Sequence, residues 1–379
     1  MKIRFILPVL VLLSIVSTGM AQNWRGLTSG TTTVLNSVRF ISGSTGFAFG
    51  GNVVVKTTNG GTSWAPATGV TAGNAYTAMH FANSTGWLVG DVLTKTTDGG
   101  VTWTSQKTTA MTLVTFRAVF AASATTAYVV GASFSPAGGA IYKTTDGGTN
   151  WVSQTSGTTN TLNGVYCTDV NTCFIAANAT TLLKTTNGGA NWVAKTVPAG
   201  NYNAIHFTSA TTGYAGGLSG TSAAIKTTDA GETWATQTTS TTSNGFQAIH
   251  FPDANTGYGV GVALAGSNTI RKTTNGGTTW TVETVDTAGV GLVTLTGVHC
   301  TGLSTCYAVG SGGKILMTGT AVPVLSWRRP YLTAQNKVVT VFDLQGRKTH
   351  LYSGKPHHAV YAVEFENGTF QASVPFGNR

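Results

Sequence analysis

Short runs of alternating apolar and polar residues recur along most of the chain. Seven copies share one form: an apolar–variable–apolar triplet, a polar turn, and a second short apolar run that begins with a small or aromatic residue. Alternation over so few residues predicts β-strands that bury every second side chain. The triplets occupy residues 38–40, 79–81, 118–120, 165–167, 205–207, 249–251 and 298–300.

A nine-residue turn motif follows six of these strand pairs. It has the form Lys-Thr-Thr-Asx-x-Gly-x-x-Trp, where Asx is Asp or Asn. Its copies span residues 56–64, 95–103, 143–151, 184–192, 226–234 and 272–280, so that they start 39, 48, 41, 42 and 46 residues apart. Such a period is typical of one four-stranded blade of a β-propeller.

The seventh triplet lacks the turn motif and the Trp strand that follow the other six. The start of the chain supplies a match, because residues 23–32 closely resemble residues 150–159. The sequence therefore predicts an all-β, seven-bladed β-propeller in which an N-terminal strand closes the last blade and leaves no open edge. A small C-terminal β segment follows.

The turn motif is predicted to be structural. Its Asx side chain is expected to accept backbone N–H groups of its own turn, its second Gly to supply a positive φ, and its Trp to pack between blades. Asp and Asn alternate at the acidic position, which a catalytic carboxylate or a Ca²⁺ ligand would not tolerate. The structural set is Asn59, Trp64, Asp98, Trp103, Asp146, Trp151, Asn187, Trp192, Asp229, Trp234, Asn275 and Trp280.

This turn is identified as the Asp-box of BNR-repeat propellers. With the strand pair before it, the pattern resembles the photosystem II assembly and stability factors over about residues 23–319. The resemblance implies a non-enzymatic scaffold that binds a protein partner, without a catalytic residue, cofactor or metal. The alternative is a carbohydrate-binding or sialidase-like, glycoside-hydrolysing propeller. Sialidases need an arginine cluster, and residues 22–320 contain only Arg25, Arg39, Arg117 and Arg271.

The middle residue of each triplet forms a candidate binding set. Equivalent positions of a closed ring lie at one level around its axis, so these side chains are expected to fill the interface between blades or to line a wet channel. A pH-sensitive or metal-binding ring is the other interpretation. The positions are Arg39, His80, Val119, Tyr166, His206, His250 and His299. Binding is also expected at two insertions between second and third strands, residues 133–139 and 263–268.

The distribution of charge limits the class of partner, and the cysteines predict disulfides. The formal net charge is +10, but the repeated Lys residues are spread around the ring and are expected to be solvated, which disfavours nucleic acid. Cys167 with Cys173, and Cys300 with Cys306, flank equivalent turns and predict two hairpin disulfides. We expect a monomer without stable membrane insertion.

The ends of the chain predict export. Residues 1–21 have the basic start, apolar run and small-residue cleavage site of a signal peptide, so the protein is expected to be secreted, periplasmic or cell-surface. Residues 22–320 form the predicted propeller, 321–336 a linker, and 337–379 a small β tail. Residues 341–347 resemble the C-terminal sorting domains of the type IX secretion system.

Overall fold

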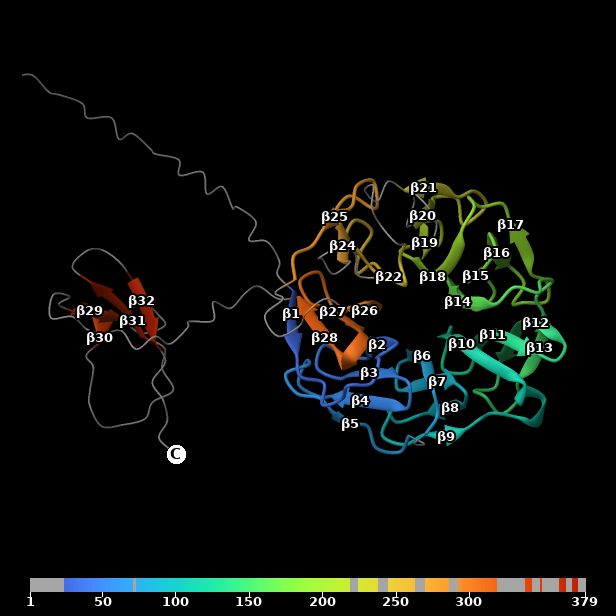
Figure 1. The fold of residues 1–379 in the computed structure, drawn as a ribbon, viewed down its shortest axis with the longest axis horizontal. Helices are drawn as coiled ribbons and strands as arrows, with labels where there is room; N and C mark the ends of the chain where they lie inside the picture. Colours follow the sequence, from blue (N-terminus) through green and yellow to red (C-terminus); the bar gives the residue numbers. More distant parts are fainter. Residues whose placement is uncertain are drawn as a thin grey trace, which may run out of the picture. The chain divides into compact units, whose positions relative to one another are not determined.

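Seven four-stranded antiparallel sheets stand around a central axis in the computed structural model (Figure 1). The structure describes residues 24–70, 73–218, 224–237, 245–262, 270–285, 291, 293–318, 338–342, 348–349, 361–365 and 370–373. The predicted signal peptide, the predicted linker and the insertion at 263–268 lie outside these residues. The chain divides into two compact units, Met1–Val322 and Pro323–Arg379.

Each sheet is one blade, and its first strand lines the axis beside the first strands of the neighbouring blades. Blades 1 to 3 consist of β2 (Ser37–Phe40), β3 (Gly46–Gly50), β4 (Val53–Thr57) and β5 (Ala65–Pro66); β6 (Tyr76–Ala82), β7 (Thr85–Gly90), β8 (Leu93–Thr96) and β9 (Thr104–Ser105); and β10 (Val114–Ala121), β11 (Ala127–Phe134), β12 (Ala137–Thr144) and β13 (Val152–Thr155). Blades 4 and 5 consist of β14 (Leu162–Cys167), β15 (Cys173–Ala177), β16 (Thr181–Thr185) and β17 (Val193–Lys195); and β18 (Asn201–Phe207), β19 (Gly213–Leu218), β20 (Ala224–Thr227) and β21 (Ala235–Gln237). Blade 6 consists of β22 (Ala248–His250), β23 (Gly257–Val260), β24 (Ile270–Thr273) and β25 (Thr281–Val282).

Blade 7 combines the two ends of the propeller, which confirms the predicted closure. Its inner strands are β26 (Leu295–Cys300), β27 (Cys306–Gly310) and β28 (Ile315–Thr318), and its outer strand is β1 (Trp24–Leu27). Strand β1 pairs antiparallel with β28, and Figure 1 shows the two side by side. Trp24 is fully buried and packs edge-on against Tyr258 of blade 6, with ring centroids 5.7 Å apart.

A cross-strand pair at the end of each first strand sets the blade core. In four blades the pair is Phe opposite Gly, and a Cβ at Gly86, for example, would lie 2.4 Å from the Phe81 ring. In blades 4 and 7 the same position holds the Cys167–Cys173 and Cys300–Cys306 disulfides, with Cα–Cα distances of 4.0 and 3.9 Å. Both predicted disulfides are therefore confirmed, and they agree with an oxidising compartment.

The six Asp-box turns share one hydrogen-bond network. In each turn, the Thr two residues before the Asx donates to the Asx Oδ1 over 2.7–3.0 Å and accepts the N–H of the second Gly over 2.7–2.9 Å. The Asx Oδ1 also accepts the N–H of the residue four positions later. Since Asp and Asn both supply this oxygen, the network explains why they alternate.

The two Gly positions of the turn differ in the space around them. Both adopt a positive φ, and the second also lies against the preceding blade, so that a Cβ at Gly100 would be 2.5 Å from Phe47. The first position has more room, and in blade 5 it holds Ala230 with a φ of 59°. Only the second position is therefore closed to a side chain.

The repeated Lys is an inter-blade contact rather than the solvated charge expected from the sequence. Its ammonium lies over an aromatic ring of its own blade, 5.2–5.9 Å from the centroid in all six copies. Four copies also bond to the Asp-box turn of the next blade. Lys143 Nζ donates to the Gly188 carbonyl over 2.8 Å, and Lys184 pairs with Glu232 over 2.6 Å. Alternation along the strand could not reveal this contact, because the acceptor belongs to the next repeat.

The C-terminal unit contains a four-stranded sheet with the order β30-β29-β31-β32. Its strands are β29 (Val338–Phe342), β30 (Lys348–Thr349), β31 (Tyr361–Phe365) and β32 (Phe370–Ser373). Residues 343–347 lie outside the described part, and the sorting-domain resemblance remains a prediction. Among the residues that the structure describes, no helix is both long and apolar enough to cross a membrane.

Candidate functional site: the central channel and its mouth

The strand order gives the propeller two distinct faces. All four strands of a blade are antiparallel, so the start of the first strand and the connection between the second and third lie at one end of the axis. We call this end the mouth face. The Asp-box turns, between the third and fourth strands, lie at the other end, which we call the turn face. Loop geometry therefore separates the repeated turns from the variable connections.

A polar side chain from every blade surrounds the axis at the mouth face. Five of these residues lie at register shifts of the first strand, where a β-bulge redirects the side chain. This mouth ring consists of Asn36, Thr77, Arg117, Asn163, Asn203, Gln247 and Thr296. Most members fasten their blade to the next one; Asn36, for example, donates to the Tyr76 carbonyl over 2.7 Å, and Thr77 to the Phe116 carbonyl over 2.9 Å.

The mouth ring opens into a cavity of about 420 Å³, which we call the mouth cup. The next position along the first strand is small in every blade, which keeps the cup wide. Six of these residues line the cup and are its wall residues: Ser37, Ala78, Ala118, Gly164, Ala204 and Ala248. Gly297 holds the same position in blade 7. Arg117 is the one charged residue among those that line the cup, and it is exposed.

A second ring of side chains lies nearer the turn face, two residues after the small wall position on each first strand. Its members contact each other in sequence. Ring centroids are 4.1 Å apart for His80 and Phe120, 4.7 Å for Phe120 and Tyr166, 5.1 Å for Tyr166 and His206, and 4.8 Å for His206 and His250. His250 and His299 follow at 4.6 Å, and Arg39 Nη2 lies 2.9 Å from His80 Nε2. We call this set, with Arg39, the floor ring.

Six of the seven residues that were predicted to share one level around the axis belong to the floor ring. The prediction for the seventh, Val119, is wrong. In blade 3, Phe120 rather than Val119 belongs to the ring, since it pairs with Tyr128 just as His80 pairs with Trp87. Val119 is buried in the blade core. The triplet pattern equated Phe120 with Phe81 because both are Phe. In the structure, Ala121, which pairs with Ala127, occupies the position in blade 3 that Phe81 occupies in blade 2.

Burial dominates the electrostatics of the floor ring. It lowers the pKa of His206 to about 4 and that of Arg39 to about 10, and it holds the pKa of His80, His250 and His299 well below the usual value. The nearby charge of Arg39 adds to the shift of each His. The four imidazoles are therefore neutral near pH 7, while Arg39 stays charged. Among the described residues, no group of His, Cys, Asp or Glu could hold a metal ion.

The carboxylates in the described part of the propeller have local structural roles or lie away from the channel. Asp169 and Asp253 cap turns by accepting N–H groups, and Glu232 pairs with Lys184 and Lys195. Glu283 lies after the outer strand of blade 6, where burial raises its pKa. None of the residues that line the mouth cup carries a carboxylate, so the cup lacks the pair of acids that glycoside hydrolysis requires.

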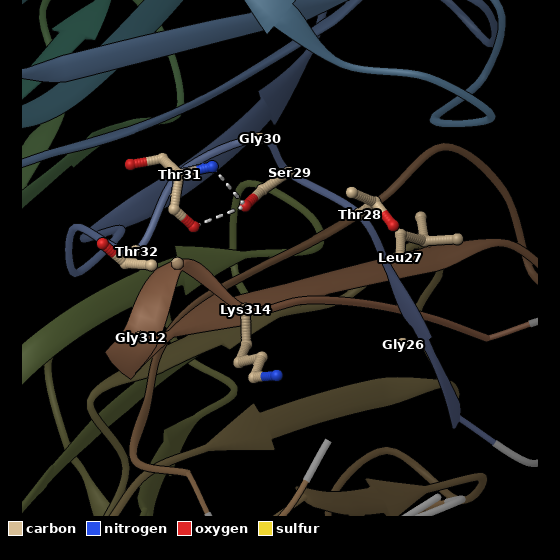
Figure 2. Close-up of a pocket in the computed structure, with 10 residues that line it drawn as sticks. Gly26, Leu27, Thr28, Ser29, Gly30, Thr31, Thr32, Gly312 and Lys314 are labelled. Carbon is tan, nitrogen blue, oxygen red and sulfur yellow. Dashed lines mark hydrogen bonds between the residues drawn. The ribbon is translucent and has the colours of Figure 1, made fainter. Parts of the chain in front are cut away.

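Two further cavities open on the mouth face, both beside a Thr-Ser-Gly-Thr segment. One, about 740 Å³, lies where β1 leaves blade 7 (Figure 2), and Lys314 is its one charged lining residue. The Ser29 hydroxyl there donates to the Thr31 carbonyl and accepts the Thr31 N–H. The other, about 440 Å³, lies under the β11–β12 hairpin of blade 3, where Phe134 is 68% exposed.

The sequence analysis missed the mouth ring, although a signal for it exists. A polar residue stands three positions before each floor-ring residue in all seven blades, from Asn36 before Arg39 to Thr296 before His299. In blade 3 this offset leads from Arg117 to Phe120, and it would also have corrected the choice of Val119. The offset was hidden because the bulge breaks strict alternation.

Comparisons with known proteins support this architecture. Residues 16–169 match the family model of the photosynthesis system II assembly factor YCF48. The chain is a seven-bladed β-propeller that resembles the photosystem II assembly factors. No match was found among curated proteins.

Solved structures share the fold. A structure of YCF48 bound to D1 peptide is 19% identical with a TM-score of 0.63, covering 79% of this chain and 100% of its own. YCF48 from Cyanidioschyzon merolae is 19% identical with a TM-score of 0.62, covering 78% and 98%. The GH74 enzyme of Niastella koreensis is 13% identical with a TM-score of 0.61, covering 90% of this chain but 59% of its own. At these identities, the likeness concerns the fold.

Proposed function

We propose that this protein is a non-enzymatic scaffold that works outside the cytoplasm and binds a segment of a protein partner in the mouth cup. One similar structure, YCF48, was solved with a D1 peptide bound, which supports a protein segment as the ligand class. The mouth cup has the size of a small-ligand pocket or of a few peptide residues. Its small wall residues would let a peptide backbone approach closely.

The observation that carries the proposal is that blades 3 and 6 deviate from the other five in the same two ways. In the other blades the mouth-ring side chain bonds the next blade, as Asn163 bonds the Tyr202 carbonyl, Asn203 the Phe246 carbonyl and Thr296 the Leu35 carbonyl. Within the described residues, the side chains of Arg117 in blade 3 and Gln247 in blade 6 make no such bond. Their donors are therefore available to a ligand.

The second deviation is length. The two longest repeat spacings, 48 and 46 residues, fall in blades 3 and 6, because both contain an insertion between the second and third strands. Antiparallel connectivity puts that connection at the mouth face in every blade. The insertions and the unbonded mouth-ring side chains therefore belong to the same two blades. This combination is typical of binding loops carried by a rigid scaffold. The exposed Phe134, the last residue of β11, would offer the partner an apolar contact.

Site-directed photo-crosslinking tests this function. A photoreactive amino acid at position 247, introduced in the cells that make the protein, should give one dominant protein adduct that mass spectrometry identifies. The same label at Val193, which is 55% exposed on the outer strand β17, is the control and should give none. Equal labelling from both positions would contradict a specific site at the mouth.

The identified partner then allows an affinity measurement. Arg117→Ala with Gln247→Ala should weaken binding at least tenfold, while Arg25→Ala, which removes an exposed charge from the outer strand β1, should not. Exchange of residues 133–139 for the short connection 50–52 should also weaken it. A folded double variant that binds fully would exclude this surface. Robust glycoside turnover by the wild type would favour the alternative of a carbohydrate-active propeller.

A further inference from the structure

The floor ring contains a partly buried cation, Arg39, without a carboxylate partner. Its members are Arg39, His80, Phe120, Tyr166, His206, His250 and His299, and none of them is acidic. No ion pair of Arg39 is found among the described residues, and its buried Nε has no hydrogen-bond acceptor. A cation that is partly removed from water is unfavourable unless something compensates its charge.

Backbone N–H groups fix the state of three imidazoles in the ring. Ala121 N–H donates to His80 Nδ1 over 3.2 Å, Cys300 N–H to His250 Nδ1 over 3.3 Å, and Phe40 N–H to His299 Nδ1 over 3.4 Å. An imidazole that accepts a hydrogen bond has one unprotonated nitrogen, and its neutral form carries the proton on the other. Each of these three His residues is therefore a neutral ring with a donor at Nε2.

This assignment creates a conflict between His80 and Arg39. Arg39 Nη2 lies 2.9 Å from His80 Nε2, yet the guanidinium is always a donor and Nε2 is already protonated. Two N–H groups at this distance repel each other unless both donate to a common acceptor. The Tyr166 hydroxyl donates to the Phe207 carbonyl over 2.9 Å, so only its oxygen could accept. The ring thus has several donors and almost no acceptors.

We propose that the floor ring binds a small inorganic anion, of the halide class, held by Arg39 and by the Nε2–H groups of His80, His250 and His299. A halide accepts several N–H groups at once and compensates the charge of Arg39. Because neighbouring members touch, we expect chloride or bromide to fit better than sulfate or phosphate.

The test uses chloride and bromide on the full-length protein. At constant ionic strength, replacement of sodium gluconate by sodium chloride should raise the melting temperature saturably, because a ligand that binds only the folded state stabilises it. Arg39→Gln should abolish this dependence. Arg117→Gln, which removes an exposed Arg of the same channel, should retain it and controls for general salt effects.

Two direct measurements complete the test. Crystals grown in sodium bromide should show an anomalous peak within the floor ring of the wild type, and ¹⁵N NMR should assign the Nε2–H tautomer to His80. A water molecule in place of the peak, a melting temperature that is insensitive to halide, or an Nδ1–H tautomer at His80 would each overturn the proposal. If Arg39→Gln fails to fold, the bromide peak and the tautomer decide. None of these results depends on a protein partner, so the proposed function is tested separately.

Discussion

The Asp-box turns and the central channel are built from the same seven-fold repeat and differ in how strictly they keep it. Six turns share the same Thr–Asx–Gly hydrogen bonds, with distances that agree within 0.3 Å. Along the channel, by contrast, the floor ring presents four His, one Arg, one Tyr and one Phe at equivalent positions. A turn whose hydrogen bonds are all local can adopt the same geometry in each of the six blades that contain it. In the channel, each side chain packs against those of the two adjacent blades, so its surroundings differ from one blade to the next.

The comparison shows where a repeat protein can carry specific function. A feature repeated in most blades, such as the Lys that bonds to the next turn, holds the ring together. A feature that appears in one or two blades, such as the unbonded Arg117 and Gln247, has no such role to perform. Stability is therefore expected to depend on the turn face and the closure, and binding on the mouth face.

The largest effect is expected at the closure of the ring. Deletion of residues 22–32 removes the outer strand of blade 7 and exposes the edge of β28, so we expect aggregation or loss of cooperative unfolding. Trp24→Ala, which removes one buried side chain, should lower the free energy of unfolding by roughly 3–5 kcal/mol. Urea denaturation measures both, with Val193→Ala on the outer strand β17 as the control. A truncated protein with an unchanged melting temperature would show that closure is dispensable.

The second largest effect is expected from acid, which should destabilise the folded protein through the floor ring. The pKa of His206 is about 4 in the folded protein and about 6.5 in an unfolded chain. Because the folded pKa is the lower one, the unfolded state takes up the proton first, and stability is lost as the pH falls from about 6.5 towards 4. The shift of His206 alone corresponds to roughly 3 kcal/mol. His80, His250 and His299 shift in the same direction.

The pH effect can be assigned to the ring by substitution. The other titratable or charged groups that face these imidazoles are Arg39 and Tyr166, neither of which changes charge between pH 4 and 7. His206→Gln should therefore flatten the dependence of melting temperature on pH below 6.5. The same slope in wild type and variant would assign the acid sensitivity to other groups.

A smaller effect is expected within one Asp-box turn. Gly100→Ala introduces a Cβ 2.5 Å from the Phe47 ring at a φ of 78°, and should cost about 2–4 kcal/mol from strain and overpacking. Gly99→Ala is the matched control: its φ is 70°, but the nearest atom to its Cβ lies at 3.6 Å. It should cost about 1 kcal/mol, as Ala230 already occupies this position in blade 5. Equal losses would mean that φ alone selects glycine in the turn.

The smallest effect should follow Asp98→Asn. The carboxylate accepts the Thr96 hydroxyl and the backbone and side chain of Thr102, which hold its pKa well below the usual range. An amide keeps the Oδ1 bonds and can donate to the Thr102 hydroxyl, as Asn59 donates to Ser63 and Asn275 to Thr279. We expect no measurable change in melting temperature. A clear loss of stability, or of any enzymatic turnover, would give this carboxylate a specific role.

The sequence by itself determined the blade number, the closure by residues 24–27, the Asp-box geometry and both disulfides. These features depend on a period, on residue type and on hydrogen bonds within a few residues. The internal match between residues 23–32 and 150–159 even predicted a contact between the two ends of the propeller. That prediction succeeded because the other six blades show which strand sequence the seventh one lacks.

Only the tertiary structure decided what happens between blades. The repeated Lys was expected in solvent, but its acceptors belong to the next repeat, as Lys226 with the Gly276 carbonyl illustrates. Phe120 replaced Val119 in the floor ring because strand register, not residue type, sets which side chain faces the axis. The mouth ring was missed because β-bulges interrupt the alternation that sequence patterns detect. For the repeated Lys the deciding neighbour belongs to the next blade, as Gly276 does for Lys226. For Phe120 and the mouth ring it is the register of the adjacent strand in the same blade.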